Sequence, residues 1–272
     1  MARIIIFSDI DGTLIDFEQY SFAETAGTVA AVVGRGVPLV LCSSKTRTEQ
    51  AALREALGIP DPFIVENGSA IFIQPGTFDF DFPHRRLDGF QVIETGLPAG
   101  QIRTALAAAG QATGLELRGL DALSVTEVAQ ATGLDEAAAA RARQRDYSET
   151  IVTPLTSADL ATVRASPPMR RLNIVSGGRF HTVTGSGADK GAAVKILAGL
   201  YRRQLGDIVT IGLGDSANDR PMLAAVDRPY LVQKPGGTWE VMDVPGLVRV
   251  SAVGPSGWRE VMSEELRLMN DE

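Results

Sequence analysis

The stretch Ile4-Ile5-Ile6-Phe7-Ser8-Asp9-Ile10-Asp11-Gly12-Thr13 decides the fold of this 272-residue chain. Residues 4–7 form an apolar run of strand length, which is typical of a strand buried on both faces of a parallel sheet. Two carboxylates separated by one residue follow in a turn that contains glycine. Because reacting groups gather at the carboxyl ends of strands in open parallel sheets, the stretch predicts an α/β fold with a polar site at the sheet edge.

Strands and helices alternate on both sides of a central region. The predicted strands are residues 4–7, 37–42, 63–65, 208–213, 230–232 and 247–250, and the predicted helices are 25–33, 46–57, 190–205, 220–226 and 258–269. This alternation predicts a Rossmann-like parallel-sheet core. A turn at Glu66-Asn67-Gly68 predicts a hairpin between residues 63–65 and 70–73.

The composition of the sequence changes near Phe82, where the alternation of strands and helices stops. Ala-rich, helix-prone segments at 98–113 and 124–145 are followed by predicted strands at 150–153, 171–175 and 180–183. Gly185-Ser186-Gly187 then has the composition of a linker. We therefore expect a discontinuous core, residues 1–84 and 186–272, interrupted by an inserted α+β domain of residues 85–185.

Charge and cysteine content narrow the class of protein. The formal net charge is -7 and no Lys/Arg block is present, so nucleic acid and anionic membranes are not expected partners. The single cysteine, Cys42, allows no intrachain disulfide, and the apolar run at the N-terminus is too short for a signal peptide. These features predict a cytoplasmic protein. No oligomerisation motif is visible, so the oligomeric state stays unknown.

The pair Asp9 and Asp11 suits metal-dependent chemistry. Two neighbouring carboxylates repel each other and call for a cation, and hard oxygen ligands suit Mg²⁺. An aspartate can also attack phosphorus, while a second carboxyl group protonates the leaving alcohol. The alternative interpretation is an Asp-Gly turn with solvated carboxylates.

Three further motifs also stand at helix starts or strand ends. Ser43-Ser44-Lys45 could hold a phosphoryl oxygen, although a serine there could simply cap the next helix. Lys190 of Asp189-Lys190-Gly191 could neutralise phosphate, although it could be a surface lysine. In the loop 214–219, Asp215 is a further metal ligand, and Asp219 would support the lysine or the metal's water ligands.

The order and placement of these motifs resemble the haloacid dehalogenase superfamily of phosphatases. The resemblance covers the whole predicted core. It implies that Asp9 is the nucleophile and Asp11 the general acid/base, and that Ser43 and Lys190 bind phosphate. It also implies that Asp9, Asp215 and the backbone carbonyl of Asp11 hold Mg²⁺.

The insertion resembles the large α+β (C2-type) cap of the branch that acts on sugar phosphates. A narrower resemblance, to mannosyl-3-phosphoglycerate phosphatases, is carried by the segments 41–47, 145–149, 177–181 and 231–237, although Thr150 stands where proline is expected. It implies a substrate with a carboxylate, a phosphate and a sugar. Its expected contacts are with Ser43, Ser44, Lys45, Arg145, Ser148, Glu149, Arg179, Lys190 and Asn218.

The sequence therefore predicts hydrolysis of mannosyl-3-phosphoglycerate, or of its glucosyl counterpart, through an aspartyl-phosphate. A broader sugar-phosphate or sucrose-phosphate phosphatase and a phosphomutase remain alternatives. A non-enzymatic phospho-receiver is a third class, but the complete set of Asp9, Asp11, Lys190 and Asp215 speaks against it.

Overall fold

The protein, described here by a computed structural model over residues 3–177 and 180–271, is built around a five-stranded parallel sheet. Its strand order is β12-β11-β10-β1-β2. The bounds are β1 (Arg3–Ser8), β2 (Leu39–Leu41), β10 (Ile208–Gly214), β11 (Arg228–Gln233) and β12 (Val248–Val253). Every pairing in this sheet is parallel, which confirms the predicted Rossmann-like core.

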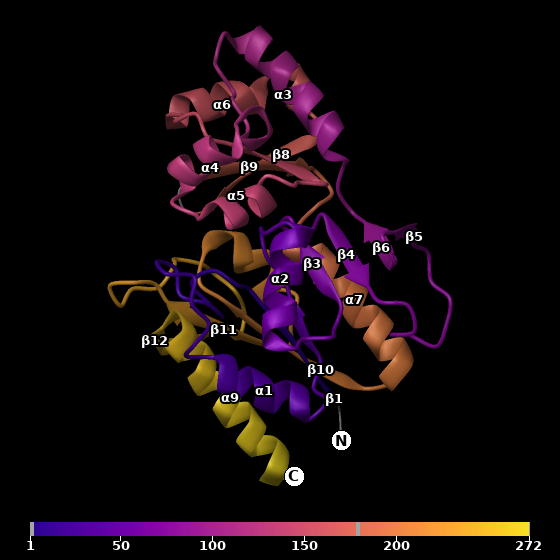
Figure 1. The fold of residues 1–272 in the computed structure, drawn as a ribbon. Coiled ribbons are helices and arrows are strands. Elements are labelled where there is room, and N and C mark those ends of the chain that lie inside the picture. The colour runs from indigo at the N-terminus through magenta and orange to yellow at the C-terminus, as the bar shows by residue number, and fades with distance from the viewer. Residues whose placement is uncertain (1–2, 178–179, 272) are drawn as a thin grey trace.

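Helices cover both faces of this sheet (Figure 1). On one face, Ile6 packs with Val29 of α1 (Ala26–Gly34) and Trp258 of α9 (Gly254–Asp271). On the other face, Ile5 and Phe7 pack with α7 (Lys190–Leu205) and α8 (Arg220–Leu223). The apolar run 4–7 is thus divided between two hydrophobic clusters, as expected of a strand buried on both faces.

A second, antiparallel sheet extends the core. Its order is β3-β4-β6-β5, with β3 (Phe63–Val65), β4 (Ala70–Ile73), β6 (Phe90–Glu94) and β5 (Arg85–Leu87). The predicted hairpin between β3 and β4 is confirmed, and its turn holds Glu66 and Asn67 at φ 50° and 60°. Because β6 pairs with β4, we propose residues 95–185 as the inserted unit, starting later than residue 85, and call it the cap.

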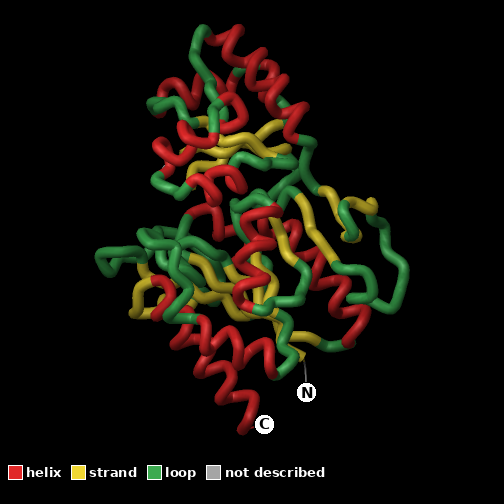
Figure 2. The backbone as a smooth tube through the Cα atoms, viewed as in Figure 1, coloured by secondary structure: helices red, strands yellow, loops and turns green. Residues whose placement is uncertain are grey.

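The cap is a three-stranded antiparallel sheet with helices (Figures 1 and 2). The sheet order is β7-β9-β8, with β7 (Ser148–Ile151), β8 (Leu172–Gly177) and β9 (Phe180–Gly185). The helices are α3 (Ala99–Thr113), α4 (Val125–Thr132), α5 (Glu136–Ala142) and α6 (Ser157–Ala165). The helix-prone segment 124–145 forms two helices because Gly133, at φ 82°, ends α4, and Asp135 caps α5.

Two short features place the functional loops. Thr46 and Glu49 form a capping box that starts α2 (Arg47–Leu57), directly after the predicted serine motif. Asp189 caps α7 through its side chain, which accepts a hydrogen bond from the backbone N–H of Ala192.

Among the described helices, none combines the length and the apolar character that a membrane crossing requires.

Candidate active site

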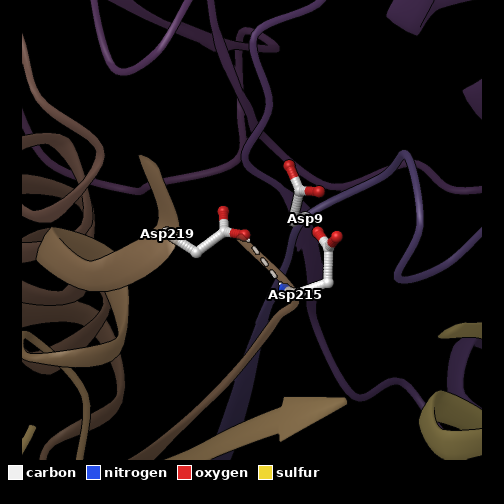
Figure 3. Close-up of side chains that lie close together, drawn as sticks. All are labelled: Asp9, Asp215 and Asp219. Carbon is white, nitrogen blue, oxygen red and sulfur yellow. Dashed lines mark hydrogen bonds between the residues drawn. The ribbon is translucent and has the colours of Figure 1, made fainter. Parts of the chain in front are cut away.

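Asp9 and Asp215 meet at the carboxyl edge of the parallel sheet. They follow β1 and β10, which are neighbours paired in register from Arg3 with Ile208 to Ser8 with Leu213. Together with Asp219 they form a group of buried carboxylates whose nearest oxygens lie within 4.8 Å of one another. Figure 3 shows the three side chains close together, with the carboxylate of Asp219 hydrogen-bonded to the backbone nitrogen of Asp215. The sheet therefore brings together residues 206 positions apart in sequence, counting from Asp9 to Asp215.

Lys190 lies between two of these carboxylates. Its Nζ donates to Oδ1 of Asp9 and to Oδ1 of Asp219, each at 2.6 Å, and its side chain is 1% exposed. Burial alone would lower the pKa of Lys190, but the charges of Asp219 and Asp9 outweigh it and raise that pKa. The lysine is therefore a fixed positive charge at this site.

Both carboxylate oxygens of Asp219 accept hydrogen bonds from other groups of the protein. Oδ1 accepts from Lys190, and Oδ2 accepts from the backbone N–H groups of Asp215 and Ser216, each at 3.0 Å. This arrangement fixes the loop that carries Asp215. It leaves Asp219 less available to a metal than Asp9 or Asp215.

The three carboxylates of Asp9, Asp215 and Asp219 together carry more negative charge than Lys190 can balance. Burial and the charge of Asp219 raise the pKa of Asp9 well above its usual value, although Lys190 opposes them. Burial and Asp219 likewise raise the pKa of Asp215 to about 7. Three buried carboxylates face one ammonium, and a divalent cation with a preference for oxygen ligands would relieve that imbalance. The residues present thus fit a metal site.

Gly12 brings the first motif against Asp215. Its φ is 75°, and a Cβ atom there would lie 2.9 Å from Oδ2 of Asp215. Thr13 also donates to Oδ1 of Asp215 across 3.4 Å. The Asp-Gly-Thr turn therefore packs directly on the carboxylate group, which a side chain at position 12 would prevent.

Asp11 is not one of the three grouped carboxylates, and its side chain pairs with Lys45. Its Oδ1 lies 3.0 Å from Nζ of Lys45, which also lies 3.7 Å from Oε1 of Glu49. Burial alone would lower the pKa of Lys45, but Asp11 and Glu49 outweigh it and raise that pKa. Ser43 is buried, and its hydroxyl accepts from the backbone N–H of Lys45 at 3.2 Å.

A cavity of about 650 Å³ opens beside Lys190, between the core and β8 of the cap. Asn218, a predicted substrate contact, lines it and donates to Oδ1 of Asn67 at 3.2 Å. Sequence reasoning missed Asn67 and Asn173 as lining residues. The sequence marks Asn67 as part of a turn but assigns it no contact, and no pattern marks Asn173. We call this the Lys190 cavity; its full lining is Asn67, Arg164, Met169, Leu172, Asn173, Ile174, Val175, Ser176, Ala188, Asp189, Lys190, Ala217, Asn218 and Pro221.

Of the cap residues predicted to contact substrate, the three that the structure describes, Arg145, Ser148 and Glu149, do not line that cavity. Arg145 donates to Ser148 at 2.8 Å and to the carbonyl of Ser44 at 3.4 Å, which connects cap and core. Glu149 is buried and accepts from Arg103 at 2.7 Å. Arg179 lies outside the described residues. The substrate contacts assigned to these four residues stay predictions.

Glu66, which sequence reasoning treated only as part of a turn, ties the core to the cap. It is fully buried and accepts from the backbone N–H groups of Asp146 and Tyr147 at 2.9 and 3.1 Å. The hydroxyl of Ser148 also donates to it. Burial raises the pKa of Glu66 even though Arg145 and these hydrogen bonds favour its charged form.

Comparisons with known proteins agree with this geometry. Residues 6–79 match the model of the haloacid dehalogenase-like hydrolase family. A glucosyl-3-phosphoglycerate/mannosyl-3-phosphoglycerate phosphatase of Methanococcoides burtonii is 37% identical over 96% of this chain and 96% of its own. A mannosyl-3-phosphoglycerate phosphatase of Pyrococcus horikoshii is 36% identical over 84% of this chain and 90% of its own.

A solved structure has the same fold. A sugar phosphatase of subclass IIB of the haloacid dehalogenase superfamily superposes with a TM-score of 0.61, at 18% identity, over 96% of this chain and 98% of its own. This confirms the predicted α/β core with an inserted cap. With full-length relatives above 30% identity, the chain belongs to the haloacid dehalogenase-like hydrolases and, within them, to the glucosyl-3-phosphoglycerate/mannosyl-3-phosphoglycerate phosphatase family.

Proposed function

We propose that the chain releases inorganic phosphate from mannosyl-3-phosphoglycerate or glucosyl-3-phosphoglycerate through an aspartyl-phosphate on Asp9. The observation that carries this proposal is the position of Asp9, which is buried beside Asp215 and held 2.6 Å from Lys190 at the sheet edge. The substrate class is supported by the names of the full-length relatives.

The proposed metal is Mg²⁺, held by the carboxylates of Asp9 and Asp215 and by the backbone carbonyl of Asp11. When bound, Mg²⁺ supplies positive charge that offsets the repulsion between an anionic nucleophile and an anionic phosphate. Asp219 would hold Lys190 and the Asp215 loop in place, as its hydrogen bonds indicate.

The first step is attack on phosphorus by Asp9. Its Oδ1 accepts from Lys190, and among the hydrogen bonds of the described residues none has a donor to Oδ2. Oδ2 is thus the oxygen available for attack. As the new P–O bond forms, the bond to the glycerate oxygen breaks, and Asp11, as the general acid, gives a proton to that leaving oxygen.

The second step regenerates the enzyme. A water molecule attacks the phosphorus of the aspartyl-phosphate, Asp11 takes the proton of that water, and the P–O bond to Asp9 breaks. Inorganic phosphate leaves and Asp9 is again a carboxylate. Asp11 pairs with Lys45 in the structure, and for both steps its carboxyl group must reach the oxygen that gains or loses the proton. Lys190 and Ser43 would stabilise the phosphoryl oxygens through charge and hydrogen bonds.

The test is phosphate release by the purified protein with Mg²⁺. The substrates are mannosyl-3-phosphoglycerate, glucosyl-3-phosphoglycerate, sucrose-6-phosphate and simple hexose phosphates. We expect a preference of about a hundredfold or more in kcat/KM for the glyceryl-linked substrates, or roughly 2.7 kcal/mol of differential transition-state binding. Equal rates across the panel would rule out the narrow substrate, and isomerisation without phosphate release would indicate a mutase.

A further inference from the structure

Glu66 belongs to a turn that is fixed to the core through its backbone. The N–H of the next residue, Asn67, donates to the carbonyl of Ser43 at 3.0 Å. The residue after that, Gly68, has φ 87°, and a Cβ atom there would lie 2.2 Å from the carbonyl oxygen of Asp189. The turn is thus fixed to the predicted serine motif and packed against the residue that caps α7.

The carboxylate of Glu66 connects this turn to the cap. Its Oε1 accepts from the backbone N–H of Asp146 at 2.9 Å, and its Oε2 accepts from that of Tyr147 at 3.1 Å. The hydroxyl of Ser148, the first residue of β7, donates to the same Oε2. Three donors from consecutive residues therefore meet one buried carboxylate, and the guanidinium of Arg145 lies 4.0 Å away.

The cap sheet joins this contact to the Lys190 cavity. Ser148 of β7 stands opposite Thr184 of β9, and Thr184 stands opposite Asn173 of β8. Asn173 lines the Lys190 cavity, as do the residues on either side of it in β8. The residue that Glu66 holds and a residue of the cavity wall thus lie in one row across the sheet. Because paired strands keep a fixed register, the position of Ser148 sets the position of that wall.

We propose that Glu66 is a positioning residue, which fixes the cap wall of the Lys190 cavity, formed by β8, relative to the core. Its carboxylate acts on the cap through Ser148 and the strands β7 and β9, while its turn is fixed to the core at Asn67 and Gly68. A substrate whose sugar or glycerate group contacts that wall is thereby held in a defined position relative to Lys190. The inference rests on the proposed function, because it concerns the substrate of that reaction.

Glu66→Gln tests this role, because it nearly keeps the shape of the side chain. An amide has one acceptor oxygen, whereas the backbone N–H groups of Asp146 and Tyr147 donate to different oxygens of the carboxylate. In either orientation the amide NH₂ group faces one of these donors, so at least one hydrogen bond is lost. The matched control is Glu94→Gln, since Oε1 of Glu94 accepts from the hydroxyl of Tyr147 at 2.8 Å and also joins core to cap, but from outside the turn.

The first measurement is kcat/KM with Mg²⁺ for the glyceryl-linked substrates and for p-nitrophenyl phosphate. The leaving group of p-nitrophenyl phosphate brings no hydroxyl or carboxylate group to the cap wall. We expect Glu66→Gln to lower kcat/KM for the glyceryl-linked substrates about tenfold or more, because their reacting atoms are no longer held in position. For p-nitrophenyl phosphate the change should stay below about twofold, and Glu94→Gln should change neither value by more than about twofold.

The second measurement needs no activity. Hydrogen–deuterium exchange in the segment 146–151 should be about tenfold faster in Glu66→Gln than in the parent chain, whereas Glu94→Gln should exchange like the parent. If Glu66→Gln does not fold, Glu66→Asp replaces it. This variant keeps the charge on a side chain one methylene shorter, and it should shift the substrate preference in the same direction.

Two results would overturn the inference. An equal fall of kcat/KM for both kinds of substrate would show that Glu66 supports the fold in general and not the cap wall. An unchanged substrate preference together with faster exchange in 146–151 would show that the contact with β7 does not set that wall. Failure of the proposed function appears in the parent chain itself, as equal rates across the substrate panel. The Glu66→Gln comparison is then made with a hexose phosphate of the panel in place of the glyceryl-linked substrates.

Discussion

Nζ of Lys190 lies 2.6 Å from Oδ1 of Asp9, and both side chains are buried. The same Nζ lies 2.6 Å from Asp219, so one ammonium group serves two carboxylates. Because both groups are buried, the position and protonation of Asp9 depend on Lys190. Stability and catalysis should respond together when this lysine is changed.

Lys190→Met should destabilise the metal-free protein by about 3–5 kcal/mol at neutral pH, because it leaves Asp9 and Asp219 buried without a counter-charge. Urea unfolding with chelator present measures this. Lys195→Met is the matched control, since Lys195 is exposed on the same helix. Equal stability of the two variants would show that Lys190 does not balance the buried carboxylates.

Asp9→Asn should lower kcat by roughly 10³-fold or more, because an amide cannot act as the nucleophile. The same change should not lower the thermal stability of the metal-free protein, since the raised pKa of Asp9 shows that its charge is unfavourable there. Asp79→Asn, at an exposed position, is the control. Full activity in Asp9→Asn would remove the nucleophile assignment.

Mg²⁺ affinity should fall as pH decreases through about 7. The pKa of Asp215 is raised to about 7 in the metal-free protein, so below that pH a proton competes with the metal for this carboxylate. Without metal the pH dependence of stability is opposite. The folded protein favours the protonated form of Asp215, so the contribution of this carboxyl group to the free energy of unfolding is lost as pH rises toward 7. Unfolding temperatures between pH 5 and pH 8, with Mg²⁺ or with chelator, test both trends. A pH-independent Mg²⁺ affinity would contradict this prediction.

The sequence predicted the core well because its signals are local. The apolar run 4–7 indicates a strand that is covered on both faces. The loop ending at Asp219 follows β10, which pairs directly beside β1. The strand β5, by contrast, reads Arg-Arg-Leu and carries no apolar pattern. Its place beside β6 depends on strand pairing, which composition does not reveal, so the proposed later start of the insertion rests on the sheet and not on the sequence.

The contacts of the cap are also hard to predict, because they depend on segments that are distant in sequence. Which side of the cap faces Lys190 is set by contacts between distant segments, such as Glu66 with the start of β7. The segment 145–149 contains side chains that suit substrate binding. In the structure, Arg145 and Ser148 of this segment form hydrogen bonds that join the cap to the core. Asn173 lines the Lys190 cavity, and an isolated asparagine in a strand carries no sequence signal.

Gly12→Ala should cost more than backbone strain alone. Its φ is 75°, and the added Cβ would lie 2.9 Å from Oδ2 of Asp215. The matched control is Gly36→Ala, where φ is 67° and nothing lies within 4 Å of the added Cβ. Each variant should lose about 1–2 kcal/mol from the left-handed backbone, but only Gly12→Ala should displace Asp215 and weaken Mg²⁺ binding, by roughly tenfold or more. Calorimetric titration with Mg²⁺ and urea unfolding separate these effects. Equal Mg²⁺ affinity in the two variants would mean that Asp215 does not hold the metal, since its carboxylate is the group that the new methyl would move.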